Sequence, residues 1–248
     1  MWAWGTPRWK LATLNILLFS DSDRDSQGRV RIDGLRFEHL VRVLKIKNGS
    51  QLRLGKLHGK IGLGTVLEIN NSDAIISVEL DQAPPPKLPL DLILAMPRPK
   101  VLRRVLRTVA ELGVSDLHLI NSYRVEKSYW STPVLNDTTI RKYFIQGLEQ
   151  ARDTIVPKLY LHRRFKPFVE DELPALLKNK RSLVAHPGDY PLCPQGITQD
   201  TVLFIGPEGG FIPYEIESLQ GSGCEVVSLG NRILRVENAL SSIIGRLF

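Results

Sequence analysis

Cysteine is scarce in this chain of 248 residues, and its near absence excludes several classes of protein. The two cysteines, Cys193 and Cys224, form neither a metal-binding spacing nor a disulfide framework. The histidines also lack the spacing of a zinc site, so no metal is expected. A reducing compartment, the cytoplasm, is therefore predicted.

Long apolar runs are missing as well. The run "WKLATLNILLF" near the N-terminus is far too short to span a bilayer, and it passes into "SDSDRDS" without a small-residue cleavage site. We expect no membrane segment and no secretory signal. Residues 15–19 are predicted to form a first strand, whereas residues 1–13 form an N-terminal extension to which no element is assigned.

Familiar nucleotide-binding motifs are also absent. The sequence contains no GxxxxGK[ST] loop and no GxGxxG fingerprint, which disfavours a P-loop enzyme and a nicotinamide-dependent dehydrogenase. No low-complexity tract or repeated period is found either. The chain is predicted to be an ordinary soluble protein of one or two domains.

Basic residues, in contrast, are in excess. The 33 Lys and Arg residues outnumber the 26 Asp and Glu residues, which gives a formal charge of +7. Such an excess favours a polyanionic partner such as nucleic acid, although it also occurs in proteins that bind none.

Prolines divide the chain into two regions. The segment "QAPPPKLP", residues 82–89, excludes a helix and favours a stiff connector, so we predict a domain over residues 14–82, a linker over residues 83–89 and a domain over residues 90–248. In the first domain, runs such as "IGLGTVLEI" and "AIISVEL" predict strands, "RFEHLVRVL" predicts a helix, and Asn48-Gly49 predicts a hairpin turn. A small β-rich barrel is the expected architecture.

The second region alternates strand patterns with helix patterns. Strands are predicted at "LDLILAM", "DLHLI", "RSLVAH", "TVLFIG" and "EVVSLG", and helices at "KVLRRVLRTVAELG", "TTIRKYFIQGLEQAR", "PYEIESLQGSG" and "VENALSSIIGRL". Alternation of this kind predicts an α/β fold with a mostly parallel sheet covered on both faces. In such sheets ligands bind beyond the carboxyl ends of the strands.

Two loops after predicted strands stand out. In "TVLFIGPEGGFIPYEIESL" two adjacent glycines allow positive φ or a close approach of a ligand to the backbone, and the alternative is a tight turn between strand and helix. The segment "VVSLGNRILRVENAL" repeats the design with a strand, a glycine, two arginines and a helix. Two neighbouring loops of this kind are able to close on one ligand.

These loops carry a resemblance to a known family. "FIGPEGGF" followed by "LGNRILRVENA" resembles the signature loops of the SPOUT methyltransferases, and specifically the bacterial 16S rRNA uracil-N3 methyltransferase family, RsmE. "HLVRVLKIKNGS", "AELGV" and "GLEQARDTIVP" are similar to further motifs of that family, in the same order. The sequence departs from it at Val236 and Asn238, where the family has two threonines.

The resemblance implies a PUA-like barrel that helps to hold RNA and an α/β domain that ends in a trefoil knot. It also implies a homodimer that binds S-adenosylmethionine in the knot loops and methylates 16S rRNA of the small ribosomal subunit. The implied cofactor-binding residues are Ala185, His186, Ile205, Gly206, Pro207, Glu208, Gly209, Gly210, Leu229, Gly230, Ile233, Leu234, Val236 and Ala239.

Arginines of the second loop are the predicted catalytic residues. The uracil N3 is protonated and poorly nucleophilic, so the enzyme must stabilise the anion that forms on the carbonyl oxygens. Arg232 and Arg235 are candidates for this role because they are multi-donor cations. Glu237 is predicted to hold the uracil or accept a proton, and the alternative is a carboxylate that only interacts with a helix dipole.

Further basic and aromatic residues are candidates for RNA contact, with a solvated surface as the alternative. The candidate cations are Arg29, Arg31, Arg36, Arg42, Lys45, Lys100, Arg103, Arg104, Arg107 and Arg124. Tyr123 and Trp130 follow the carboxyl end of a predicted strand. Their rings are candidates for stacking on an unpaired base, and the alternative is that they belong to a partly buried loop. Two other functions stay open: methylation of a different base or ribose, and an assembly factor that has lost catalysis.

Overall fold

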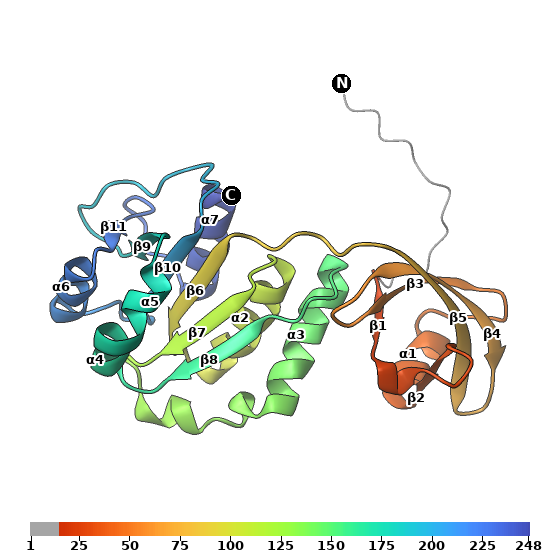
Figure 1. Ribbon diagram of the computed structural model, residues 1–248. Coiled ribbons are helices and arrows are strands. Elements are labelled where there is room, and N and C mark those ends of the chain that lie inside the picture. The colour runs from red at the N-terminus through yellow and green to blue at the C-terminus, as the bar shows by residue number, and fades with distance from the viewer. Residues whose placement is uncertain (1–14) are drawn as a thin grey trace. The chain divides into compact units, whose positions relative to one another are not determined.

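The computed structural model describes residues 15–248, so the predicted extension over residues 1–13 lies outside the described range. Two compact units are present: the first extends to Pro85 and includes Glu149–Ile155, and the second comprises Pro86–Leu148 and Val156–Phe248. Figure 1 shows the elements of both units along the chain.

The strands have the following bounds: β1 Leu17–Phe19, β2 Val30–Asp33, β3 Gln51–Lys56, β4 Ile61–Ile69, β5 Asp73–Gln82, β6 Leu90–Ala95, β7 Asp116–Ile120, β8 Lys158–His162, β9 Arg181–Ala185, β10 Thr201–Ile205 and β11 Glu225–Val227. The α-helices are α1 Gly34–Arg42, α2 Pro99–Glu111, α3 Asp137–Ala151, α4 Phe165–Pro167, α5 Leu173–Leu177, α6 Pro213–Gly221 and α7 Val236–Leu247. Short helical turns lie at Asp21–Asp23, Lys127–Ser131, Pro133–Leu135 and Phe168–Glu172.

The first unit is a five-stranded sheet with the order β1-β3-β4-β5-β2, curled into a nearly closed barrel. The β1–β3 pair is parallel and the other pairs are antiparallel. Its core contains fully buried apolar side chains such as Phe19, Ile32, Leu54 and Ile76, and Leu40 of α1 packs into the same cluster. Alternation of apolar and polar residues along the strands therefore produces the PUA-like barrel that was predicted.

One turn in this barrel was predicted wrongly. Asn48 and Gly49 lie in a turn closed by Ser50 N–H donating to the Lys47 carbonyl at 2.9 Å. This turn joins α1 to β3, because the strand β2 is followed by the helix and not by a second strand. The dipeptide forms a turn as its composition requires, but no hairpin.

A segment from the middle of the chain completes the first unit. Thr154 of the Glu149–Ile155 segment donates its hydroxyl to the Gly59 carbonyl at 2.6 Å and accepts the His58 N–H at 2.8 Å. At Gly55 an added Cβ would lie 2.6 Å from the Thr154 methyl group, so only glycine allows the strand to approach the segment this closely.

The second unit contains a six-stranded sheet with the order β11-β9-β10-β6-β7-β8, and every pair is parallel. Helices cover both faces (Figure 1), as a sheet of fully buried strands such as β10 requires. The α/β prediction is confirmed. The strand β8 and the helical turns over residues 165–177 were not predicted.

The order of the strands defines where the chain reverses direction across the sheet. From β6 the chain proceeds outward through β7 to β8, and it then returns to build β9, β10 and β11 on the other side. The reversal lies between β6 and β10, whose residues are paired from Leu90 and Thr201 to Leu94 and Ile205. Loops that leave the carboxyl ends at such a point form the usual binding crevice of an open α/β sheet.

No helix within residues 15–248 is both long and apolar enough to cross a membrane. Over the same residues, no group of three or more His, Cys, Asp or Glu side chains is arranged to hold a metal ion.

Candidate active site

Three adjacent parallel strands end at the same edge of the second sheet. The strands β11, β9 and β10 end at Val227, Ala185 and Ile205. Each strand contains buried apolar residues close to its end, and a glycine or proline follows that end within three residues, which breaks the strand and starts a loop. The three loops therefore emerge side by side.

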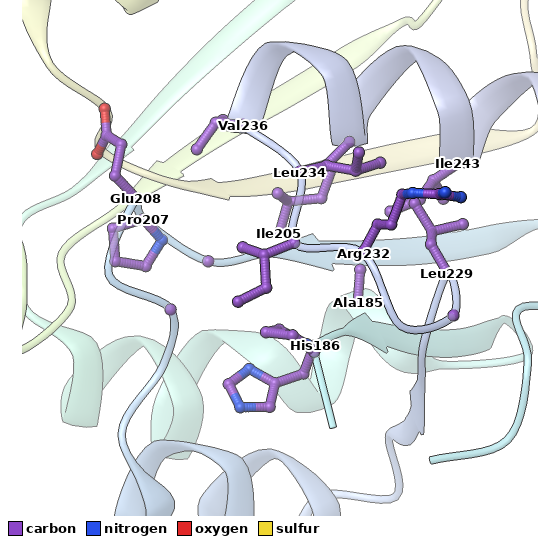
Figure 2. Close-up of a pocket in the computed structure, with 16 residues that line it drawn as sticks. Ala185, His186, Ile205, Pro207, Glu208, Leu229, Arg232, Leu234, Val236 and Ile243 are labelled. Atoms are coloured by element: carbon purple, nitrogen blue, oxygen red, sulfur yellow. The ribbon is translucent and has the colours of Figure 1, made fainter. Parts of the chain in front are cut away.

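A pocket lies between these loops and the start of α7 (Figure 2). Figure 2 shows Val236 and Ile243 on one side of the pocket, Ile205 in the middle and His186 on the opposite side. The lining residues are Ala185, His186, Pro187, Ile205, Gly206, Pro207, Glu208, Gly210, Leu229, Gly230, Arg232, Ile233, Leu234, Val236, Ala239 and Ile243.

The walls combine apolar side chains with bare main chain. Ile233 and Leu234 line the pocket although they are 82% and 37% exposed, so the pocket presents apolar surface that residues 15–248 leave uncovered. Gly210 and Gly230 have φ values of +72° and +95°, a conformation that residues with a side chain rarely adopt. A ligand is thus able to touch the backbone directly at both loops.

His186 supplies one polar group to this largely apolar site. Its Nδ1 atom is buried and has no hydrogen-bond partner among the described residues. Burial, assisted by the nearby Arg124 guanidinium, lowers the pKa of His186, so the imidazole is neutral at neutral pH. A buried nitrogen without a partner costs free energy, and a ligand that satisfies it recovers this cost.

The loop after β10 is fixed by contacts with the loops after β6 and β7. Arg98 N–H, at the end of the β6 loop, donates to Glu208 Oε1 at 3.2 Å, and Arg124 Nη1 donates to the Gly209 carbonyl. Gly210 N–H donates to the Pro207 carbonyl at 2.8 Å, which closes the turn itself. Hydrogen bonds from the neighbouring loops and one hydrogen bond within the turn therefore fix its conformation.

The Glu215 side chain connects the loop after β7 with the loop after β10. Its side chain is only 2% exposed, and it lies in the first turn of α6. The carboxylate accepts hydrogen bonds from the Ser122 hydroxyl at 3.1 Å, the Tyr123 N–H at 2.8 Å and the Ile212 N–H at 3.0 Å. One buried carboxylate thus joins the β7 loop to the β10 loop.

Comparison with known families adds independent information. Residues 84–247 match the RNA methyltransferase domain family, and residues 32–79 match the RNA methyltransferase PUA domain family. The chain belongs to the RNA methyltransferase family. The pocket at the ends of β9, β10 and β11 lies within the part of the chain that carries this match.

Individual relatives of this RNA methyltransferase agree with the family match. The ribosomal RNA small subunit methyltransferase E of Treponema pallidum is 29% identical over 210 residues, which covers 82% of this chain and 79% of the relative. The fold is shared with a ribosomal RNA small subunit methyltransferase E from Neisseria gonorrhoeae bound to S-adenosyl methionine, with a TM-score of 0.71, 20% identity and coverage of 92% and 95%. A methyltransferase of Legionella pneumophila in complex with bound SAM has a TM-score of 0.67, 23% identity and coverage of 93% and 94%.

Most of the residues predicted from the loops lie together in this RNA methyltransferase. All of the predicted cofactor residues except Gly209 line the pocket, and so does Arg232. Gly209 faces away: an added Cβ there would lie 2.9 Å from the Arg124 side chain. Its lack of a side chain makes room for Arg124.

The other two predicted catalytic residues lie outside the lining. Arg235 is exposed at the N-cap of α7, where its carbonyl accepts the Ala239 N–H at 2.8 Å. Glu237 Oε1 accepts from Arg104 Nη1 at 2.9 Å, and this ion pair joins α7 to α2. Glu237 therefore already has an ion-pair partner, Arg104, within the same chain.

The predicted RNA-contacting arginines of the barrel have carboxylate partners. Arg29 pairs with Asp25, Arg31 with Asp73, Arg36 with Asp23 and Arg42 with Glu38. These pairs are partly or largely exposed, so they contribute little to stability and leave the cations accessible. Lys45, an exposed residue with φ of +51°, follows α1.

The cations of the second unit lie mainly on α2. Lys100, Arg103 and Arg104 are exposed on this helix. Arg107 is partly buried, lies over the Tyr143 ring at 5.0 Å and donates to the Arg103 carbonyl at 3.2 Å. The basic face expected from helical spacing is therefore present, with Arg107 at its inner border.

Sequence reasoning missed several residues of the site. Ile243 lines the pocket and was detectable because it shares the helical face of Val236 and Ala239, whereas Pro187 lies in the segment "VAHPG" that the family resemblance had already implied. Trp130 is buried, 9% exposed, and donates its indole N–H to Asn121 at 2.9 Å, which removes it as a base-stacking candidate. Arg98 carried no signal, because a single arginine in a loop is unremarkable until its neighbours are known.

Proposed function

We propose that this RNA methyltransferase uses S-adenosylmethionine to methylate N3 of a uridine in 16S rRNA. The observation that carries the proposal is the glycine-lined, largely apolar pocket at the ends of β9, β10 and β11. The names of the relatives support small-subunit rRNA as the substrate, and two similar folds solved with S-adenosylmethionine support the cofactor.

The residues of the pocket fit this cofactor. Gly206, Gly210 and Gly230 line the pocket, where main-chain groups not used within the loops would form hydrogen bonds to an adenine edge, and Leu229 and Leu234 provide apolar walls for the ring. The buried His186 Nδ1 has a free position for one polar group of the ligand. When bound, the cofactor supplies a methyl group activated by a sulfonium.

Arg232 is the best-placed residue for the acceptor side of the reaction. It lines the pocket from the second loop and is exposed, so its guanidinium is able to reach a base that enters from solvent. A fixed cation next to a uracil oxygen stabilises the negative charge that builds up as the N3 proton leaves. Arg235 and Glu237 follow Arg232 closely in the chain, at the N-cap and in the first turn of α7, and would act at the rim of the site.

The active form is proposed to be a cytoplasmic homodimer whose second domain contains the trefoil knot of the family. Ile233 and Leu234 are exposed apolar residues of the pocket, and a second copy of the chain would cover the part that the cofactor leaves open. Exposed cations of the barrel and of α2 would hold the phosphates of the rRNA.

The test is to map methylated uridines in 16S rRNA. Purified protein, S-adenosylmethionine and small subunits or rRNA from a strain lacking the gene are incubated together, and N3-methylated uridines are located by blocked reverse transcription and by mass spectrometry of nuclease fragments. We expect one N3-methylated uridine in 16S rRNA. A methyl group on another base or on a ribose would overturn the proposed position, and no transfer despite bound cofactor would leave an RNA-binding factor without catalysis.

A further inference from the structure

The three loops at the reversal point of the sheet form a surface beside the pocket. The loops after β6, β10 and β7 are tied together by the Arg98–Glu208 and Arg124–Gly209 hydrogen bonds and by Glu215. Tyr123 lies on this surface with 80% of its side chain exposed. Resting on the proposed function, we infer that Tyr123 is a stacking platform for an unpaired base of the acceptor RNA.

The backbone that carries Tyr123 is fixed although its ring is exposed. Tyr123 N–H donates to the buried Glu215 carboxylate at 2.8 Å. Ser122 and Val125 of the same loop are buried, with only 1% and 7% of their surface exposed. Val125 N–H donates to the Ser122 carbonyl at 3.0 Å, which closes a tight turn around Tyr123. An exposed aromatic ring on a fixed turn loses little entropy when a base stacks on it.

The position of the ring matches the chemistry of the pocket. Arg124, the next residue, lies against Gly209, and Gly209 belongs to the turn whose other residues line the cofactor pocket. The cofactor pocket and Arg124 therefore border the same turn, and Tyr123 directly precedes Arg124 in the chain. A base that reacts at N3 must be unpaired, because N3 lies on the Watson–Crick edge, and unpaired bases are recognised by stacking on aromatic rings.

Charges next to Tyr123 suit a nucleotide. Arg98 and Arg124 are exposed cations on the same loops, and the exposed Lys100 follows in the first turn of α2. The carboxylates of the surface are engaged: Glu208 accepts the Arg98 N–H, Glu126 accepts the Tyr129 hydroxyl, and Glu215 is buried. The surface thus offers an aromatic face for the base and cations for the adjacent phosphates.

The test compares Tyr123→Ala and Tyr123→Phe with a matched control, Tyr214→Ala. Tyr214 is an exposed tyrosine, 53% exposed, on α6 of the same unit. Each variant is assayed for S-adenosylmethionine affinity by calorimetry, for binding of a single-stranded 16S rRNA fragment by fluorescence anisotropy, and for kcat/KM of methyl transfer. Sedimentation measures the oligomeric state of each variant.

Stacking on an aromatic residue contributes about 1–3 kcal/mol per base, so Tyr123→Ala should weaken RNA binding and lower kcat/KM by roughly 5-fold to 150-fold. Tyr123→Phe should restore both, and cofactor affinity should stay within twofold in all variants. A change of less than twofold in RNA binding for Tyr123→Ala, or a loss of the dimer, would overturn the inference. If the parent protein binds RNA through Tyr123 but transfers no methyl group, the stacking site stands and the proposed function fails.

Discussion

Removal of the Glu215 carboxylate should loosen the two loops that border the pocket. In Glu215→Ala the N–H groups of Tyr123 and Ile212 lose their acceptor, and so does the Ser122 hydroxyl. A buried donor left without a partner costs about 1–3 kcal/mol. The two N–H groups are part-buried in the parent protein, so the lower half of this range applies to each, and these two groups alone account for a loss of about 2–4 kcal/mol.

For a unit of this size each kcal/mol lowers the melting temperature by roughly 2–4 °C, so the expected fall is about 4–16 °C. Glu215→Gln retains one acceptor oxygen and should lose about half as much, because its NH₂ group faces a backbone donor. Calorimetric scans measure both values, and titration with S-adenosylmethionine should show weakened affinity. Glu217→Ala, an exposed glutamate of the same helix, is the control. A melting temperature for Glu215→Ala within 2 °C of the control would refute the anchoring role.

Three further changes test other parts of the molecule. Gly210→Val, at φ of +72° and with its Cβ about 3.4 Å from the His186 ring, should abolish cofactor binding, whereas Gly196→Val, at φ of +60° in open space, should retain it in calorimetry. Arg232→Ala should slow single-turnover methylation by roughly 100-fold to 1,000-fold under saturating cofactor, and an unchanged rate would remove it from catalysis. Burial raises the pKa of Glu149 from 4.5 to about 7. Between these two pH values the folded state holds a proton that the unfolded state has released, so the free energy of unfolding falls as pH rises, by up to about 3 kcal/mol. Glu149→Gln should flatten this slope in denaturant titrations between pH 4 and 8, and a parent protein that gains stability with rising pH would contradict the assignment.

The loops of the pocket were predictable because their signals are local. A buried strand followed directly by Gly206 and Pro207, or within three residues by Gly230, marks a sharp loop at a strand end, and the apolar face of α7 follows from helical spacing. The same strands and helices predicted a parallel sheet, and parallel strands bring their carboxyl ends to one edge. The resemblance of the loops to a known family then supplied the cofactor and the substrate, and the trefoil knot stays a prediction.

Elements with weak local signals were missed or misplaced. The strand β8 has no fully buried residue, because it lies at the edge of the sheet, and its apolar run is only three residues long, between Lys158 and His162. Asn48 and Gly49 favour a turn both between two strands and between a helix and a strand. Their residue types therefore do not predict which element precedes the turn.

The sequence by itself determined the class of fold and the position of the glycine loops, because these depend on patterns within a few residues, and its resemblance to a known family implied most of the residues that line the pocket. Only the tertiary structure decided which distant groups meet. Glu215 binds Tyr123 from 92 positions away and Arg104 binds Glu237 from 133 positions away. Such contacts depend on the order of strands in the sheet, which no local periodicity encodes, and they decide that Gly209 makes room for Arg124, that Trp130 is buried, and that Tyr123 remains exposed beside the pocket.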